Sequence, residues 1–180
     1  FFTRPTKRRV SGDWIDNDPR LDKQSKDTFW GAYLTTKVTE QDSLQIYLLG
    51  ASENRDRPAN QRFEVLTAGV RLSRNPIPKA WHYDIESVYQ FGDAPALDKV
   101  SEQIDHKAKY FHLSFGYSFD ASWQPQVSFL YHYGSGDKDP LDDESNELDH
   151  MFGVPRPDFG PTGLFRAFQR VNTSSPGIIL

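Results

Sequence analysis

Within residues 107–119, KAKYFHLSFGYSF, a large apolar side chain occupies every second position from Phe111 onward, and mostly small or polar side chains lie between them. This period of two is the pattern of a β-strand with one apolar and one polar face. In a soluble protein the aromatic face would be buried in a core. In an outer-membrane β-barrel it would face lipid, and the polar face would line water. The first question is therefore which face is the inside. The apolar series consists of Phe111, Leu113, Phe115, Tyr117 and Phe119.

Composition narrows the classes of protein that fit this pattern. The 180 residues are 37% hydrophobic and 14% aromatic, and the mean hydropathy is −0.68. A disordered chain would be polar but poor in aromatic residues. No window approaches the ~18 consecutive apolar residues of a membrane helix, so a helical membrane protein is excluded. A transmembrane β-barrel passes this test, because its polar lumen face lowers the mean hydropathy.

Charge and cysteine content exclude further classes. The net charge of −4 and the pI of about 5.7 give no electrostatic footprint for a nucleic-acid partner. The chain has no cysteine, which excludes disulfides, thiolate catalysis and cysteine-ligated zinc or iron–sulfur sites. No GxSxG elbow occurs, and nothing in the sequence points to an enzyme.

Strand-like segments recur along the chain, and most run near or beyond the ~9–11 residues that a tilted strand needs to cross a bilayer. Strands of soluble proteins are usually about 5–6 residues long. Residues 1–10 form a doubtful strand end, because Pro5 lacks a backbone donor. The six clearer segments are 28–38, 43–51, 62–73, 80–92, 107–119 and 124–134.

The connections between these segments alternate in length. Short gaps at 39–42, 74–79 and 120–123 separate long polar ones. Short periplasmic turns and longer extracellular loops are typical of outer-membrane barrels. The long gaps are 11–27, 52–61, 93–106 and 135 onward.

Segment 80–92 repeats the alternation, with rings near both of its ends. Trp81 and Tyr83 lie on one face at its start, and Tyr89 and Phe91 lie on the same face at its end. Such rings match the aromatic girdles of membrane interfaces. The sequence therefore predicts an all-β, antiparallel transmembrane barrel, of which the chain supplies about six to eight strands of a larger up-and-down barrel. A soluble β-sandwich that binds carbohydrate through its aromatic residues is the alternative, because period two alone does not exclude it.

Three stretches resemble the alginate-export family of outer-membrane barrels: FFTRPTKRR followed by FWGAYLTT, then WHYDIESVYQFG, then WQPQVSFLYHYGSGDKDPLDD with LDHMFG beyond. The best motifs lie between residues 81 and 153. The resemblance implies a bacterial outer-membrane export pore for an anionic uronate polymer, acting by passive diffusion. It implies that residues 1–180 are a segment of one barrel domain and an incomplete part of a longer chain, with an extracellular loop at 135–168. A porin for small anionic or aromatic solutes is the second interpretation within transport.

The charged residues on the polar faces are the candidate lumen-lining residues. Arginine suits an anionic polymer, because its planar fork holds a carboxylate bidentately and stays charged. The alternative is that these side chains pair across strands and stiffen the wall. The placement of Arg4 and Arg8 on this face depends on residues 1–10 pairing as one strand. The candidates are Arg4, Arg8, Lys37, Arg71, Asp84 and Glu86.

Three histidines also have polar-face parity on neighbouring strands, namely His82, His112 and His132. They could approach one another, but no HExxH or His-x-His spacing supports a metal site, so we interpret His112 and His132 as polar lining residues.

The acidic stretch that begins at Ser135 could offer oxygen ligands to Ca²⁺ through Asp137, Asp139 and Asp142. Its spacing departs from the EF-hand pattern, which favours a solvated loop without cofactor. The expected partners are the bilayer, lipopolysaccharide and periplasmic export partners. Arg55, Arg57 and Arg62, near the second long gap, could steer a polyanion or bind lipopolysaccharide phosphates, but a solvated loop is the favoured interpretation.

Overall fold

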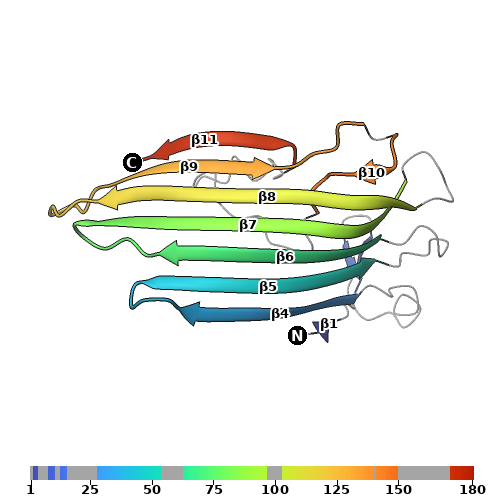
Figure 1. The fold of residues 1–180 in the computed structure, drawn as a ribbon, viewed down its shortest axis with the longest axis horizontal. Helices are drawn as coiled ribbons and strands as arrows, with labels where there is room; N and C mark the ends of the chain where they lie inside the picture. The colour runs from blue at the N-terminus through green and yellow to red at the C-terminus, as the bar shows by residue number, and fades with distance from the viewer. Residues whose placement is uncertain are drawn as a thin grey trace.

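The computed structural model describes residues 2–3, 8–10, 13–15, 28–53, 63–96, 103–139, 141–149 and 171–180. A nine-stranded sheet dominates it, with strand order β1-β4-β5-β6-β7-β8-β9-β11 and β10 beside β8 (Figure 1). Every pairing along this order is antiparallel, and only β10 runs parallel to its neighbour. The strands of the sheet are β1 (Phe2–Thr3), β4 (Thr28–Lys37), β5 (Asp42–Glu53), β6 (Phe63–Arg74), β7 (Ala80–Pro95), β8 (Gln103–Ser118), β9 (Gln126–Gly134), β10 (Glu144–Ser145) and β11 (Thr173–Ile179).

The prediction for residues 1–10 is wrong in one respect. Only β1 joins the large sheet, whereas β2 (Arg8–Val10) pairs with β3 (Asp13–Ile15) in a separate two-stranded sheet. The stretch between them includes Pro5, which supplies no backbone donor. Among the described residues there is no helix that is long and apolar enough to span a membrane.

Strand lengths agree with the sequence argument. The strands from β4 to β9 contain between 9 and 16 residues, and ~9–11 residues suffice to cross a bilayer at a tilt. The short connections 38–41, 75–79 and 119–125 all lie at one end of the sheet (Figure 1). The all-β antiparallel prediction is therefore confirmed.

The hairpin of β7 and β8 is longer than the sequence predicted. Its pairing continues to Pro95 and Gln103, so the predicted gap of 93–106 shrinks to 96–102. The apolar alternation ends before this point, since Asp93 pairs with Asp105. Backbone hydrogen bonds hold the extension, and its buried apolar side chains are the facing pair Ala94 and Ile104. One such pair is too little for the hydrophobic pattern to reveal a longer strand.

The register sorts the side chains onto two faces. One face contains the odd-numbered residues of β4, β5, β6 and β11 and the even-numbered residues of β7, β8 and β9, and we call it the polar face. We call the opposite one the aromatic face. Cross-strand partners such as Glu86 and His112 share the polar face, and Phe115 and Phe129 share the aromatic face.

Burial on these two faces is the reverse of that in a soluble sheet. Gln90 and Glu86 of the polar face are 2% and 5% exposed, whereas Trp81 and Phe115 of the aromatic face are 55% and 44% exposed. Large apolar side chains are among the residues most often buried in water-soluble proteins, and monomers rarely expose a wide apolar patch. A sheet with rings outside and polar side chains inside is the arrangement of a membrane barrel wall.

Candidate functional site

An ion pair lies at the centre of the polar face. Arg71 of β6 donates through Nε to Oδ1 of Asp84 on β7 at 2.7 Å, and its second nitrogen bonds Oδ2 of the same carboxylate. The contact is diagonal, because Arg71 stands directly opposite Glu86 in the register. Both side chains of the pair are about a quarter exposed, at 27% and 26%. A bidentate, accessible pair presents both charge signs to whatever lies over the sheet.

Glu86 is held by a tyrosine. The hydroxyl of Tyr47 donates to Oε1 of Glu86 at 2.8 Å, and the ring of Tyr47 lies so close over Gly69 that a Cβ there would meet it at 2.1 Å. Tyr33 stacks on Tyr47 with ring centroids 5.3 Å apart. The glycine under the ring therefore allows Tyr47 of β5 to reach across β6 to the carboxylate on β7.

Two of the three predicted histidines meet on the polar face. Nδ1 of His112 lies 3.1 Å from Nδ1 of His132, so one ring donates and the other accepts. His82 instead lies 2.9 Å from the hydroxyl of Ser128 and 3.2 Å from that of Ser118. The described residues contain no group of three or more histidine, cysteine or acidic side chains that could hold a metal ion.

The remaining basic candidates are dispersed. Lys37 is exposed at the end of β4, opposite Ser43, at the edge of the polar face. Arg8 lies on β2, opposite Ile15, and so does not continue the large sheet. The pairing on which its predicted inward placement depended is therefore absent, and Arg4 lies outside the described residues.

The three acidic candidates after β9 bind their own backbone. Carboxylate oxygens of Asp137, Asp139 and Asp142 accept hydrogen bonds from the backbone nitrogens of Asp139, Leu141 and Glu144, respectively. Such bonds are typical of aspartate in turns. Here these carboxylates shape the chain that leads to β10.

Residues 141–149, which we call the strap, return to the sheet instead of extending into solvent. β10 pairs in parallel with β8 at Asp105 and His106, beyond the point where the pairing of β8 with β9 ends. Leu148 is buried against Ala108 and Tyr110 of the polar face. The strap is thus attached to the sheet at both ends, whereas Leu141, Asp142 and Asp143 within it are exposed. Residues 150–168 of the expected loop lie outside the described residues.

Gln90 fixes the far end of the strap. Its Oε1 accepts from the backbone nitrogen of Asp149 at 2.8 Å, and its Nε2 donates to the Asp149 carbonyl at 2.7 Å and to Thr67 Oγ1 at 3.1 Å. Sequence reasoning missed this role of Gln90. The available signals were its polar-face parity and the leucine Leu148 within an acidic stretch.

Replacing Gln90 by leucine should release the strap. The variant removes the two bonds to Asp149, and a buried group that loses its partner costs about 1–3 kcal/mol. We expect amide hydrogen exchange at Leu148 and Asp149 to accelerate by at least about tenfold, measured by mass spectrometry in detergent. Gln126→Leu, on an exposed glutamine of β9, should leave this exchange unchanged.

Acid should weaken the other end of the strap. The ammonium group of Lys107 donates to Oε1 of Glu144 at 2.5 Å and holds the pKa of that carboxyl below its usual value. A lowered pKa means that the contact is fully present above the ordinary glutamate pKa and is lost as the pH falls through the lowered value. Carboxyl NMR titration should show the pKa of Glu144 returning to the ordinary range in Lys107→Met. An unchanged pKa would contradict this account of the contact.

Comparison with known protein families matches residues 3–175 to the family described as Alginate export. No curated protein and no solved structure matches the chain. The match extends over nearly all of the sheet and agrees with its antiparallel strands and exposed aromatic face. The chain belongs to the alginate-export family of bacterial outer-membrane β-barrels, a family of polysaccharide transport proteins and not of enzymes.

Proposed function

We propose that the polar face lines the lumen of an outer-membrane channel, through which an anionic, alginate-like polysaccharide diffuses passively. The observation that carries the proposal is the reversed burial of the two faces, with charged and polar side chains inside and rings outside. Membership of the alginate-export family supports a polysaccharide as the cargo.

The pairing of the central charges supports weak and repeated contact with a polymer. Arg71 is held by Asp84, and Glu86 accepts from Tyr47. An incoming uronate carboxylate would compete with Asp84 for the guanidinium of Arg71. Conduction requires binding that is strong enough for entry and weak enough for release, and a shared arginine meets this requirement.

We prefer a membrane barrel to the soluble β-sandwich that the sequence left open. A carbohydrate-binding β-sandwich would bury the aromatic face, and the family is an outer-membrane one, so we do not retain this interpretation. In the proposed setting the aromatic face meets lipid, and the short-turn end would face the periplasm and any export partner there. Arg55, Arg57 and Arg62, the candidates for steering a polyanion or binding lipopolysaccharide phosphates, lie outside the described residues.

Single-channel conductance of the intact protein in planar bilayers tests the cargo. Mannuronate oligomers should block the channels, and neutral glucose oligomers of equal length should block them less. Block by mannuronate should weaken in Arg71→Ala. The matched control is Lys109→Ala, which removes one positive charge from an exposed position on the aromatic face. Open channels that are indifferent to mannuronate would instead favour the porin for small solutes.

A further inference from the structure

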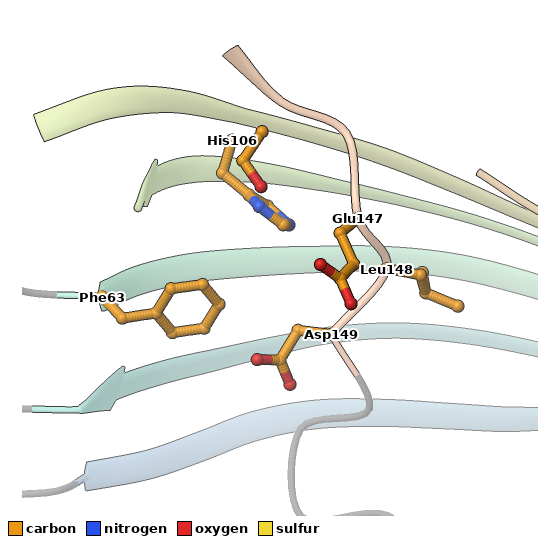
Figure 2. Close-up of a pocket in the computed structure, with 6 residues that line it drawn as sticks. Phe63, His106, Glu147, Leu148 and Asp149 are labelled. Carbon is orange, nitrogen blue, oxygen red and sulfur yellow. The ribbon is translucent and has the colours of Figure 1, made fainter. Parts of the chain in front are cut away.

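A pocket opens between the strap and the polar face (Figure 2). It lies at the end of the sheet away from the short turns, because Phe63, which lines it, begins β6. Figure 2 shows the His106 ring projecting from β8 toward Phe63, with the side chains of Glu147 and Asp149 beside them. The cavity has a volume of about 160 Å³. Since one water occupies about 30 Å³ in the liquid, the pocket has room for a group of several heavy atoms but not for a length of polymer.

The hydrogen bonds of Gln90 determine the tautomer of His106. The amide oxygen of Gln90 is identified by the backbone nitrogen of Asp149, which donates to it at 2.8 Å. The same oxygen lies 3.4 Å from Nε2 of His106. A neutral imidazole carries one N–H, so Nε2 carries it and Nδ1 is left as an acceptor.

Nδ1 of His106 is an unused acceptor in a buried side chain. His106 is 2% exposed, and this nitrogen has no hydrogen-bond partner among the described residues. Buried polar atoms of folded proteins are nearly always satisfied by protein, water or ligand. The atom therefore calls for a donor that no described residue supplies, and His106 lines the pocket.

The charged groups of the pocket also favour a ligand that donates hydrogen bonds. Glu147 and Asp149 contribute carboxylates, which are acceptors only when ionised. Lys107 stands next to His106 in the sequence, but it is bonded to Glu144 and Asp105 and is directed to the aromatic face. Phe63 supplies a ring that packs against His106 at 5.6 Å between centroids, and a ring face attracts cations.

From these contacts we propose that the pocket binds a primary ammonium group. Such a group brings three N–H donors and a positive charge to an imidazole nitrogen, two carboxylates and an aromatic ring. A uronate carboxylate would be repelled here, so the pocket differs in chemistry from the Arg71 region of the polar face. An ammonium group could come from an amino-sugar unit of a polysaccharide or from a free polyamine, and the two share this chemistry. The inference does not depend on the cargo proposed above.

Calorimetry on the intact, detergent-solubilised protein tests the pocket with three probes. These are a glucosamine trisaccharide, its fully N-acetylated counterpart and spermidine, at a pH at which the amines are protonated. We expect the amines to bind and the acetylated sugar not to bind. Glu147→Gln should weaken amine binding by about tenfold, because one charge-assisted contact is lost. His106→Phe, which keeps the ring but removes the acceptor, should weaken it as well.

The matched control is Glu64→Gln, which neutralises an exposed carboxylate next to Phe63 in sequence but on the aromatic face. It should leave amine affinity unchanged. Tighter binding of the glucosamine trisaccharide than of spermidine would identify a sugar ligand, and the reverse order a polyamine. The proposal is overturned if neither amine binds, if the acetylated sugar binds equally well, or if Glu64→Gln weakens binding as much as Glu147→Gln. Circular dichroism confirms that each variant is folded.

Discussion

Leu113→Arg should prevent stable insertion of the chain into a bilayer. Leu113 lies on the aromatic face in the middle of β8, between Ile85 of β7 and Tyr131 of β9. An arginine on the lipid side of a transmembrane strand costs about 2–4 kcal/mol at the bilayer midplane. We therefore expect the fraction of folded protein in liposomes to fall at least about tenfold under mildly denaturing urea, measured by electrophoresis of unheated samples.

The neighbouring residue provides the control. Ser114 lies on the polar face, opposite Asp84, and Ser114→Arg introduces the same side chain one position further along the strand. It should insert nearly as well as the unmodified protein, because its charge meets water and a carboxylate. Equal loss of insertion in both variants would show that the two faces do not differ in environment.

Asp84→Ala should shift the channel toward anions. The guanidinium of Arg71 is neutralised by Asp84 through two hydrogen bonds, and removal of the carboxylate leaves a positive charge on the polar face. We expect the anion-to-cation permeability ratio to rise by about threefold or more, since charges that line a pore control its selectivity. Both side chains are about a quarter exposed, so stability should fall by no more than about 1 kcal/mol. Reversal potentials in a salt gradient measure the ratio.

Two further variants separate selectivity from unspecific damage. Arg71→Ala should shift the ratio toward cations, and the double variant should lie near the unmodified protein. Asp120→Ala removes an exposed carboxylate that pairs with Lys79 in a short connection, and it should leave the ratio unchanged. A shift of the same sign in Asp84→Ala and Arg71→Ala would contradict a direct electrostatic role for the pair.

The strands and their faces followed from the sequence because both depend on the local period of two. Trp81, Phe115 and Phe129 were assigned to one face by counting positions, and the register places them together. The sequence left the contact of His112 with His132 open, since parity gives the face of a residue but not its position along the strand axis relative to the neighbouring strand. The register supplies this position, because it places the two residues directly opposite each other.

The strap could not be predicted in this way. Gln90 and Asp149 are 59 positions apart in the chain, and the strap has almost no alternation of its own. Its contacts are the two-residue pairing of β10 with β8, the contact of Glu144 with Lys107, the hydrogen bonds to Gln90 and the burial of Leu148. Contacts this short and scattered produce no periodic pattern in the sequence. The separate sheet of β2 and β3 was missed for a similar reason, because its strands are each only 3 residues long.

The orientation of the sheet is the central claim, and a single-cysteine scan of β8 tests it most directly. The chain has no cysteine, so each introduced thiol reports on one position. In the protein reconstituted in liposomes, thiols at 112 and 114 should react with a membrane-impermeant maleimide when it is present on both sides of the membrane. Fluorophores at 113 and 115 should be quenched by brominated lipid. The opposite alternation, with water at 113 and 115 and protection at 112 and 114, would place the rings in a soluble core and contradict the account.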